Sequence, residues 1–125
     1  MRWHSKLFLE QDNELVFGPG RVELLRAVRD LGSLRKAAAH LGMSYRWAWG
    51  RLKDAEMSLG VPLLETAPAQ QSGRSKRLSP QALALLAWYA TAEQAVQRAL
   101  LDCSQSAPDF LRNKLKETDV GLAHK

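Results

Sequence analysis

A short helical pattern, a glycine-containing turn and a longer helical pattern constrain the fold of this chain most strongly. Leu34–Leu41 has an apolar face of leucine and alanine, and Gly42 ends it. Ser44 is a favourable N-cap for the longer pattern, Tyr45–Leu59. The successive alanines of the first helix allow a neighbouring helix to approach closely. This order of elements predicts a helix-turn-helix.

The segments on either side of this motif predict two β-hairpins and a further helix. Ser5–Phe17 alternates apolar and polar residues around a polar turn, as hairpins do. Pro19–Leu31 is an amphipathic pattern, with Arg21 on its polar face. Leu63–Thr66 and Arg77–Ser79 are expected to pair as a wing. The predicted fold is mainly α with small β-hairpins, a winged helix-turn-helix followed by a long C-terminal dimerisation helix.

That long helix is predicted from Pro80 to Cys103, with Ser79 as its N-cap. Its apolar surface is wider than one small domain covers, and exposed apolar surface of that extent commonly marks an interface. An alternative is that a short helix at Asp109–Glu117 folds back over the same stripe. We predict a homodimer whose contacts are made by Leu85, Trp88, Tyr89, Ala92, Val96, Ala99 and Leu100.

The length of 125 residues fits a single domain with appended elements. We expect a winged helix-turn-helix with an N-terminal hairpin over residues 1–79, the dimerisation helix over 80–103 and a tail over 104–125. No signal peptide is apparent at the N-terminus. The longest nearly apolar run, Ala82–Ala92, is too short to cross a bilayer. A cytoplasmic protein without a membrane partner is therefore expected.

Positive charge is concentrated around the predicted helix-turn-helix and wing. The window from Ser33 to Arg77 holds eight basic and three acidic residues, so it accounts for the whole net charge of +5. Such a patch suits a polyanion, and double-stranded DNA is the expected partner. A solvated surface without a partner has the same composition and remains an alternative at this stage.

The outward face of Tyr45–Leu59 is predicted to be the recognition surface. Arg46 and Trp47 are expected beside the bases, because arginine can hydrogen-bond guanine in the major groove. Gly50 would allow close approach to DNA, whereas Arg51 and Lys53 are expected at phosphates. The preceding helix and the wing add backbone contacts. The residues predicted to contact DNA are therefore Arg35, Lys36, Arg46, Trp47, Gly50, Arg51, Lys53, Arg74, Lys76 and Arg77.

Neither metal binding nor catalysis is indicated. His4, His40 and His124 are far apart in the sequence, and Cys103 is the one thiol. No phosphate-binding glycine loop, nucleophile signature or pair of acids is present. We expect no catalytic residue, no metal site and no cofactor.

The order of several motifs resembles a known family. The motifs are Phe17–Arg21, Leu24-Leu25, Gly32–Leu34, Ala37-Ala38, Leu41–Arg46, Ala48-Trp49, Pro62–Glu65 and Leu78–Pro80. Together they resemble the N-terminal DNA-binding domain of ModE-type molybdate-responsive regulators, which is a LysR-like winged helix. The resemblance covers roughly Lys6–Leu101. It implies a bacterial regulator of molybdate uptake or molybdoenzyme genes that dimerises through the helix after the wing. It also implies a recognition helix that begins at Ser44, Tyr45 and Arg46, so Ser44 and Tyr45 are added to the residues expected to contact DNA.

Two departures from the family pattern shape the expectation. Full-length members carry C-terminal molybdate-binding domains, whereas fewer than 25 residues follow the long helix here. The wing segment Ala69–Lys76 is also less rich in glycine than is usual in the family. We therefore expect a sequence-specific DNA-binding regulator without its own molybdate sensor, open to control by an unknown partner protein. The alternative is a winged-helix protein-interaction adaptor without direct DNA binding, which Trp47 and Met57 on the outward face would suit.

Overall fold

The computed structural model describes residues 1–68 and 75–123, with side chains given as far as residue 116. The chain divides into two compact units, Leu7–Tyr89 and Met1–Lys6 with Ala90–Lys125. The long helix α5 (Pro80–Ser104) contributes residues to both units. The division falls within α5 because the first turns of this helix pack in the core of the first unit.

The first unit begins with a β-hairpin, as the alternating pattern predicts. β1 (Leu9–Gln11) pairs antiparallel with β2 (Glu14–Phe17). The two turn residues, Asp12 and Asn13, have φ angles of 52° and 65°. This is the left-handed region that two-residue hairpin turns require and that Asp and Asn tolerate. Helix α1 (Pro19–Leu31) follows with the predicted bounds.

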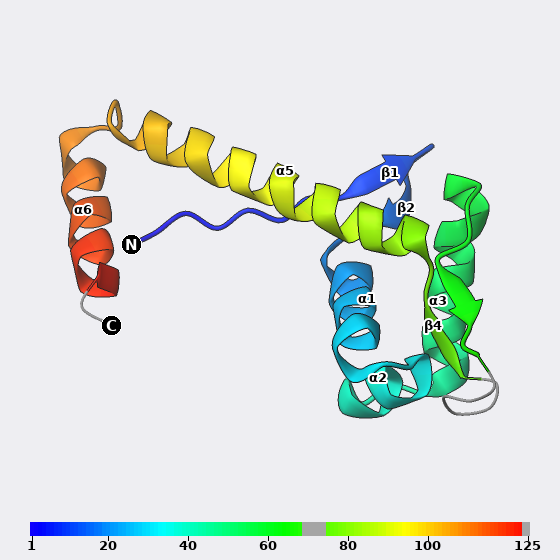
Figure 1. Ribbon diagram of the computed structural model, residues 1–125. Helices are drawn as coiled ribbons and strands as arrows, with labels where there is room; N and C mark the ends of the chain where they lie inside the picture. Colours follow the sequence, from blue (N-terminus) through cyan, green and yellow to red (C-terminus); the bar gives the residue numbers. More distant parts are fainter. Residues whose placement is uncertain (69–74, 124–125) are drawn as a thin grey trace. The chain divides into compact units, whose positions relative to one another are not determined.

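Helices α2 (Leu34–His40) and α3 (Tyr45–Leu59) form the predicted helix-turn-helix (Figure 1). Each begins after a serine, Ser33 or Ser44, whose side-chain oxygen accepts a backbone hydrogen bond at 3.1 Å. Gly42 closes the turn between the helices with φ of 71°, where a side chain would be strained. The sharp connection between α2 and α3 is thus encoded locally.

Replacing Ser44 by alanine is expected to lower the free energy of unfolding by about 1 kcal/mol, because the backbone N–H of Trp47 loses its acceptor. Chemical denaturation measures this change. Ser58→Ala is the matched control, because Ser58 is exposed later in α3 and alanine favours helix there. Equal stabilities of the two variants would show that the cap contributes nothing.

The wing strands β3 (Leu64–Thr66) and β4 (Lys76–Leu78) pair antiparallel. The core beneath them is built mainly of leucine and alanine. Among the described residues, five leucines are fully buried, two from α1, one each from α2 and α3 and one just before β3: Leu24, Leu25, Leu34, Leu52 and Leu63. Two alanines in each of α2 and α3 are also buried, which allows close helix packing as predicted: Ala37, Ala38, Ala48 and Ala55.

Helix α5 enters this core along a single stripe. Ser79 caps the helix, accepting the backbone N–H of Ala82 at 3.1 Å, as predicted. The buried stripe is Ala82, Leu86 and Tyr89. The Tyr89 hydroxyl donates to the carbonyl of Leu7 at 2.8 Å, and its ring meets Phe17 edge to face, with centroids 5.7 Å apart. Tyr89 is therefore removed from the predicted dimer surface, because its side chain is buried within its own unit.

In the second unit, α6 (Asp109–Ala123) is longer than the expected Asp109–Glu117 helix. Its Leu115 is buried. The indole N–H of Trp3 donates to the Ser104 hydroxyl oxygen at 2.8 Å, which ties the N-terminal segment to the end of α5. In the described ranges, no helix combines the length and the apolar character that crossing a membrane requires.

Candidate DNA-binding surface

A groove of about 710 Å³ lies where the start of α2, the start of α3 and the wing meet. We call it the basic groove. It is lined by the aromatic ring of Tyr45 and by four cationic side chains, Arg35, Lys36, Lys76 and Arg77. The sequence pointed to each of these residues singly. The structure brings residues from α2, α3 and β4 to one concave surface.

The helical side of the basic groove is partly preorganised. The guanidinium carbon of Arg35 lies 4.7 Å from the centre of the Tyr45 ring, a cation–π contact. Tyr45 is half-buried, whereas Arg35 and Lys36 are exposed. Ser44 is exposed and is occupied as the N-cap of α3. Two cations are thus presented at the start of α2, with one held against an aromatic ring.

The wing side of the basic groove is held by contacts across the hairpin. The Lys76 ammonium donates to the Thr66 hydroxyl oxygen at 2.8 Å. The Arg77 Nε lies 3.7 Å from a carboxylate oxygen of Glu65, so its charge is partly offset. Arg74, also predicted to contact DNA, lies outside the described residues.

The outward side of α3 presents three features that we call the recognition face: Arg46, Trp47 and Gly50. Arg46 is exposed and forms no ion pair with any side chain in the described part of the chain. Trp47 is 56% exposed. A Cβ atom placed on Gly50 would meet nothing within 4 Å, so the helix surface is bare there. The Arg46 guanidinium and the Trp47 ring therefore lie beside Gly50, where another molecule can approach the helix backbone.

The two other predicted contacts in α3 already have intramolecular partners. Arg51 lies 3.2 Å from the carboxylate of Asp54 and stacks over the Trp47 ring at 4.3 Å. Lys53 lies 2.9 Å from the carboxylate of Glu56. Contact with phosphate would compete with these pairs. In the free protein, Arg51 instead orients Trp47 on the recognition face.

Arg21 is expected on the polar face of α1, but the structure buries it. Its guanidinium donates to the carbonyls of Leu15 at 3.0 Å, Val16 at 3.2 Å and Arg51 at 3.2 Å. Burial lowers the pKa of Arg21, the charge of Arg51 lowers it further, and Asp54 raises it. Arg21 thus joins β2 to the middle of α3, and no local sequence pattern predicts this.

Glu56 fixes the end of α3 to the start of the wing. One carboxylate oxygen accepts the backbone N–H groups of Leu63 at 2.7 Å and Leu64 at 3.1 Å, and the other pairs with Lys53. Burial acts to raise the pKa of Glu56. The hydrogen bonds from Lys53, Leu63 and Leu64 outweigh burial and hold this pKa below its usual value. The folded protein therefore favours the charged carboxylate.

Glu56→Gln is expected to lower the free energy of unfolding by about 1–2 kcal/mol at pH 7, because a charged acceptor is lost. Since the folded pKa is depressed, the stabilisation is complete above the unfolded pKa of about 4.3 and is lost as the pH falls through the folded value. Urea denaturation between pH 3 and 7 should show the difference from wild type shrinking below about pH 4. The control is Glu23→Gln, exposed on α1. A pH-independent difference would show that the carboxylate charge is not responsible.

Among the residues described, no group of three or more His, Cys, Asp or Glu side chains is arranged to hold a metal ion.

Comparison with known proteins identifies the family to which the helix-turn-helix and the wing belong. Residues 20–82 match the family described as bacterial regulatory helix-turn-helix protein, lysR family. The chain belongs to this lysR family. The matched residues contain α2, α3 and both wing strands, and hence the recognition face and the basic groove. The family description is that of regulatory helix-turn-helix proteins, and the helix-turn-helix is a motif that places a recognition helix in the major groove of DNA.

Several relatives refine the likeness. Molybdenum-pterin-binding protein MopA of Rhodobacter capsulatus is 33% identical over 100 residues, covering 78% of this chain and 38% of MopA. Transcriptional regulator ModE of Haemophilus influenzae is 30% identical over 93 residues, 74% of this chain and 36% of ModE. Molybdenum transport protein ModE of Herbaspirillum seropedicae is 39% identical over 64 residues, 51% of this chain and 24% of that relative. The chain thus spans less than two fifths of these three relatives, and the expected resemblance to ModE-type regulators is confirmed.

Proposed function

We propose that this lysR-family member binds double-stranded DNA sequence-specifically as a ModE-type regulator. In this proposal the recognition face enters the major groove and the basic groove lies against the phosphate backbone. The observation that carries it is the exposed Arg46 beside the bare helix surface at Gly50. The major groove admits an α-helix, and an arginine there can bind guanine through two hydrogen bonds. The cations of the basic groove supply affinity that does not depend on sequence.

Gly50→Ala tests the close approach of DNA, because its expected effects have opposite signs. Alanine should raise the free energy of unfolding by about 0.5–1 kcal/mol, since glycine is costly within a helix and the added methyl group meets no neighbour. The same methyl group should weaken specific DNA binding if the backbone at Gly50 faces the bases. Thermal unfolding and fluorescence anisotropy measure the two effects. Raised stability with unchanged DNA affinity would place Gly50 away from the DNA.

We also propose that the regulator is a homodimer joined through α5. Trp88 is 67% exposed, Ala99 is exposed, and Leu83 on the same helix is 46% exposed. The remaining predicted contacts are half-buried: Leu85, Ala92, Val96 and Leu100. A two-fold dimer would present two recognition helices to half-sites about 34–36 Å apart, one turn of DNA.

Trp88→Glu is expected to dissociate this dimer, because a charge would be buried in an apolar interface. Light scattering at micromolar concentration should give a dimer mass for the wild type and a monomer mass for the variant. Lys6→Glu is the control, because Lys6 is exposed and outside the proposed interface. A monomeric wild type would contradict the proposal.

We further propose that DNA binding by this chain does not require molybdate. Two of the relatives are molybdenum transport proteins by name, one from Herbaspirillum seropedicae and one from Azotobacter vinelandii. The proposal rests on the exposed Arg46 and on the cations of the basic groove, since these side chains can meet bases and phosphates directly. Equal DNA affinity with and without millimolar molybdate is expected. A molybdate-dependent gain in affinity or in melting temperature would overturn this part of the proposal.

One observation favours the adaptor alternative. An apolar groove of about 220 Å³ lies beside the recognition face and is lined in part by Phe8, Leu15 and Trp47. Met57 on the same helix is 84% exposed. Exposed apolar side chains of this kind can bind a protein. The two functions predict different effects of removing Arg46. A DNA-binding regulator would lose DNA affinity, whereas an adaptor has no DNA contact to lose.

A further inference from the structure

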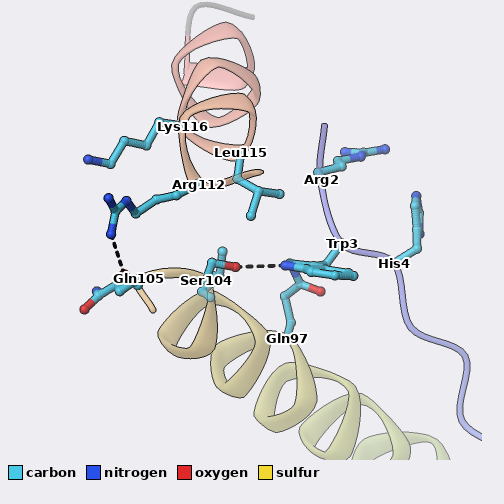
Figure 2. A pocket seen from close by; sticks show the side chains of 10 residues that line it. Arg2, Trp3, His4, Gln97, Ser104, Gln105, Arg112, Leu115 and Lys116 are labelled. Atoms are coloured by element: carbon cyan, nitrogen blue, oxygen red, sulfur yellow. Dashed lines mark hydrogen bonds between the residues drawn. The ribbon is translucent and has the colours of Figure 1, made fainter. Parts of the chain in front are cut away.

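The second compact unit contains a pocket of about 570 Å³ between the N-terminal segment, the C-terminal half of α5 and α6 (Figure 2). Its apolar surface is formed by Trp3, Leu101 and Leu115. The hydrogen bond from the Trp3 indole to Ser104 holds the ring in place, yet the side chain is 40% exposed. The volume is in the range of sites for small organic molecules, about 300–1,000 Å³. The pocket therefore offers a fixed aromatic surface that a flat molecule can cover.

Basic side chains flank this apolar surface on two sides. Arg2 and His4 come from the N-terminal segment, and Arg112 and Lys116 come from α6 (Figure 2). Among the residues whose side chains the structure describes, none that lines the pocket is an Asp or Glu. A partly enclosed surface with one sign of charge concentrates ions of the opposite sign. The lining thus selects for negative charge at the edges and for an apolar body between them.

The charges of Arg2, Arg112 and Lys116 are not needed to pair with the nearby end of α5. The last carbonyl groups of that helix already accept backbone N–H groups of the following turn. Arg112 shares its charge with Asp109 and also donates to the carbonyl of Gln105 at 3.3 Å, which fixes its position. Arg2 and Lys116 form no ion pair with any residue that the structure describes. At least one unpaired cation therefore remains on each flank.

We propose that this pocket binds a small organic anion with a flat apolar body, such as an aromatic carboxylate or a heteroaromatic phosphate ester. The body stacks on Trp3 and covers Leu101 and Leu115, and the anionic group meets Arg2 or Lys116. Charge-assisted hydrogen bonds to such groups are about twice as strong as neutral ones. A bare inorganic ion would leave the apolar surface uncovered and binds more weakly. The site lies outside residues 20–82, so it is separate from the DNA-binding function.

Isothermal titration of the full chain tests this proposal with two anionic probes, naphthalene-2,6-dicarboxylate and adenosine monophosphate. The neutral partners are naphthalene-2,6-dicarboxamide and adenosine, and inorganic phosphate supplies the charge without the body. At least one anionic probe is expected to bind about tenfold more tightly than its neutral partner and than phosphate. The proposal is overturned if neither probe binds at millimolar concentration, or if phosphate binds as tightly as either.

A pair of double variants locates the binding. Arg2→Gln with Lys116→Gln removes one cation from each flank and is expected to weaken binding about tenfold. Lys6→Gln with Arg98→Gln removes two exposed cations of the same unit that do not line the pocket, and it should bind like the wild type. Equal losses in both double variants would reduce the effect to general charge and refute the site. Circular dichroism and melting temperature confirm that each variant is folded.

Discussion

Arg46→Ala is expected to weaken binding to the specific DNA site by about 1–3 kcal/mol, roughly five- to 150-fold. Arg46 lies in the first turn of α3, where residues of recognition helices reach base edges. It is exposed and has no ion pair with the described side chains, so its removal costs the fold little. Affinity for a random duplex should change much less, because a base contact carries sequence information. Fluorescence anisotropy with both duplexes measures the difference.

The matched control is Arg29→Ala. Arg29 is also an exposed helical arginine, but it lies in α1 and pairs with Asp30 at 2.9 Å. This variant should bind both duplexes like the wild type. Equal losses on specific and random DNA for Arg46→Ala would make Arg46 a phosphate contact. Unchanged affinity on both would remove Arg46 from the DNA interface and favour the adaptor function.

Arg21→Met is expected to lower the free energy of unfolding by about 2 kcal/mol. Three carbonyl groups, from Leu15, Val16 and Arg51, lose a charged donor, and buried acceptors without partners cost about 1–3 kcal/mol each when fully shielded. Two favourable effects of the substitution reduce this total loss of stability. Methionine removes a buried charge that is costly to desolvate, and it ends the repulsion with Arg51. Urea denaturation measures the net change.

The same variant should also weaken DNA binding, because α3 loses its tie to the N-terminal hairpin. Arg29→Met is the control, since its guanidinium is exposed and bonds only the neighbouring aspartate among the contacts that the structure gives it. A melting temperature of Arg21→Met equal to that of wild type would contradict the structural role. Lost stability with unchanged DNA affinity would show that Arg21 supports the fold without positioning the recognition face.

The helices could be predicted closely because their signals are local. α1 and α3 have the predicted bounds, and the caps Ser44 and Ser79 act as expected. Cap residues, glycine at helix ends and 3.6-residue periodicity operate within a few positions of the sequence. The outline of the fold follows from them.

The misplaced or missed residues depend on contacts between distant segments. Tyr89 looks like interface material on a helical wheel, but its partner carbonyl is on Leu7. Arg21 looks like an exposed charge, but its acceptors lie on β2 and α3. The basic groove likewise forms only when β4 meets α2. A pattern in one segment cannot show what another segment brings to it.

The most direct test of the DNA-binding proposal is fluorescence anisotropy over a range of salt. It compares a duplex from the region upstream of the protein's own gene with a random duplex. Tight binding to the upstream duplex, weaker binding to the random one and affinity that falls steeply with salt are predicted, because cations of the basic groove release counterions from phosphates. Binding to neither duplex at low salt would contradict the account.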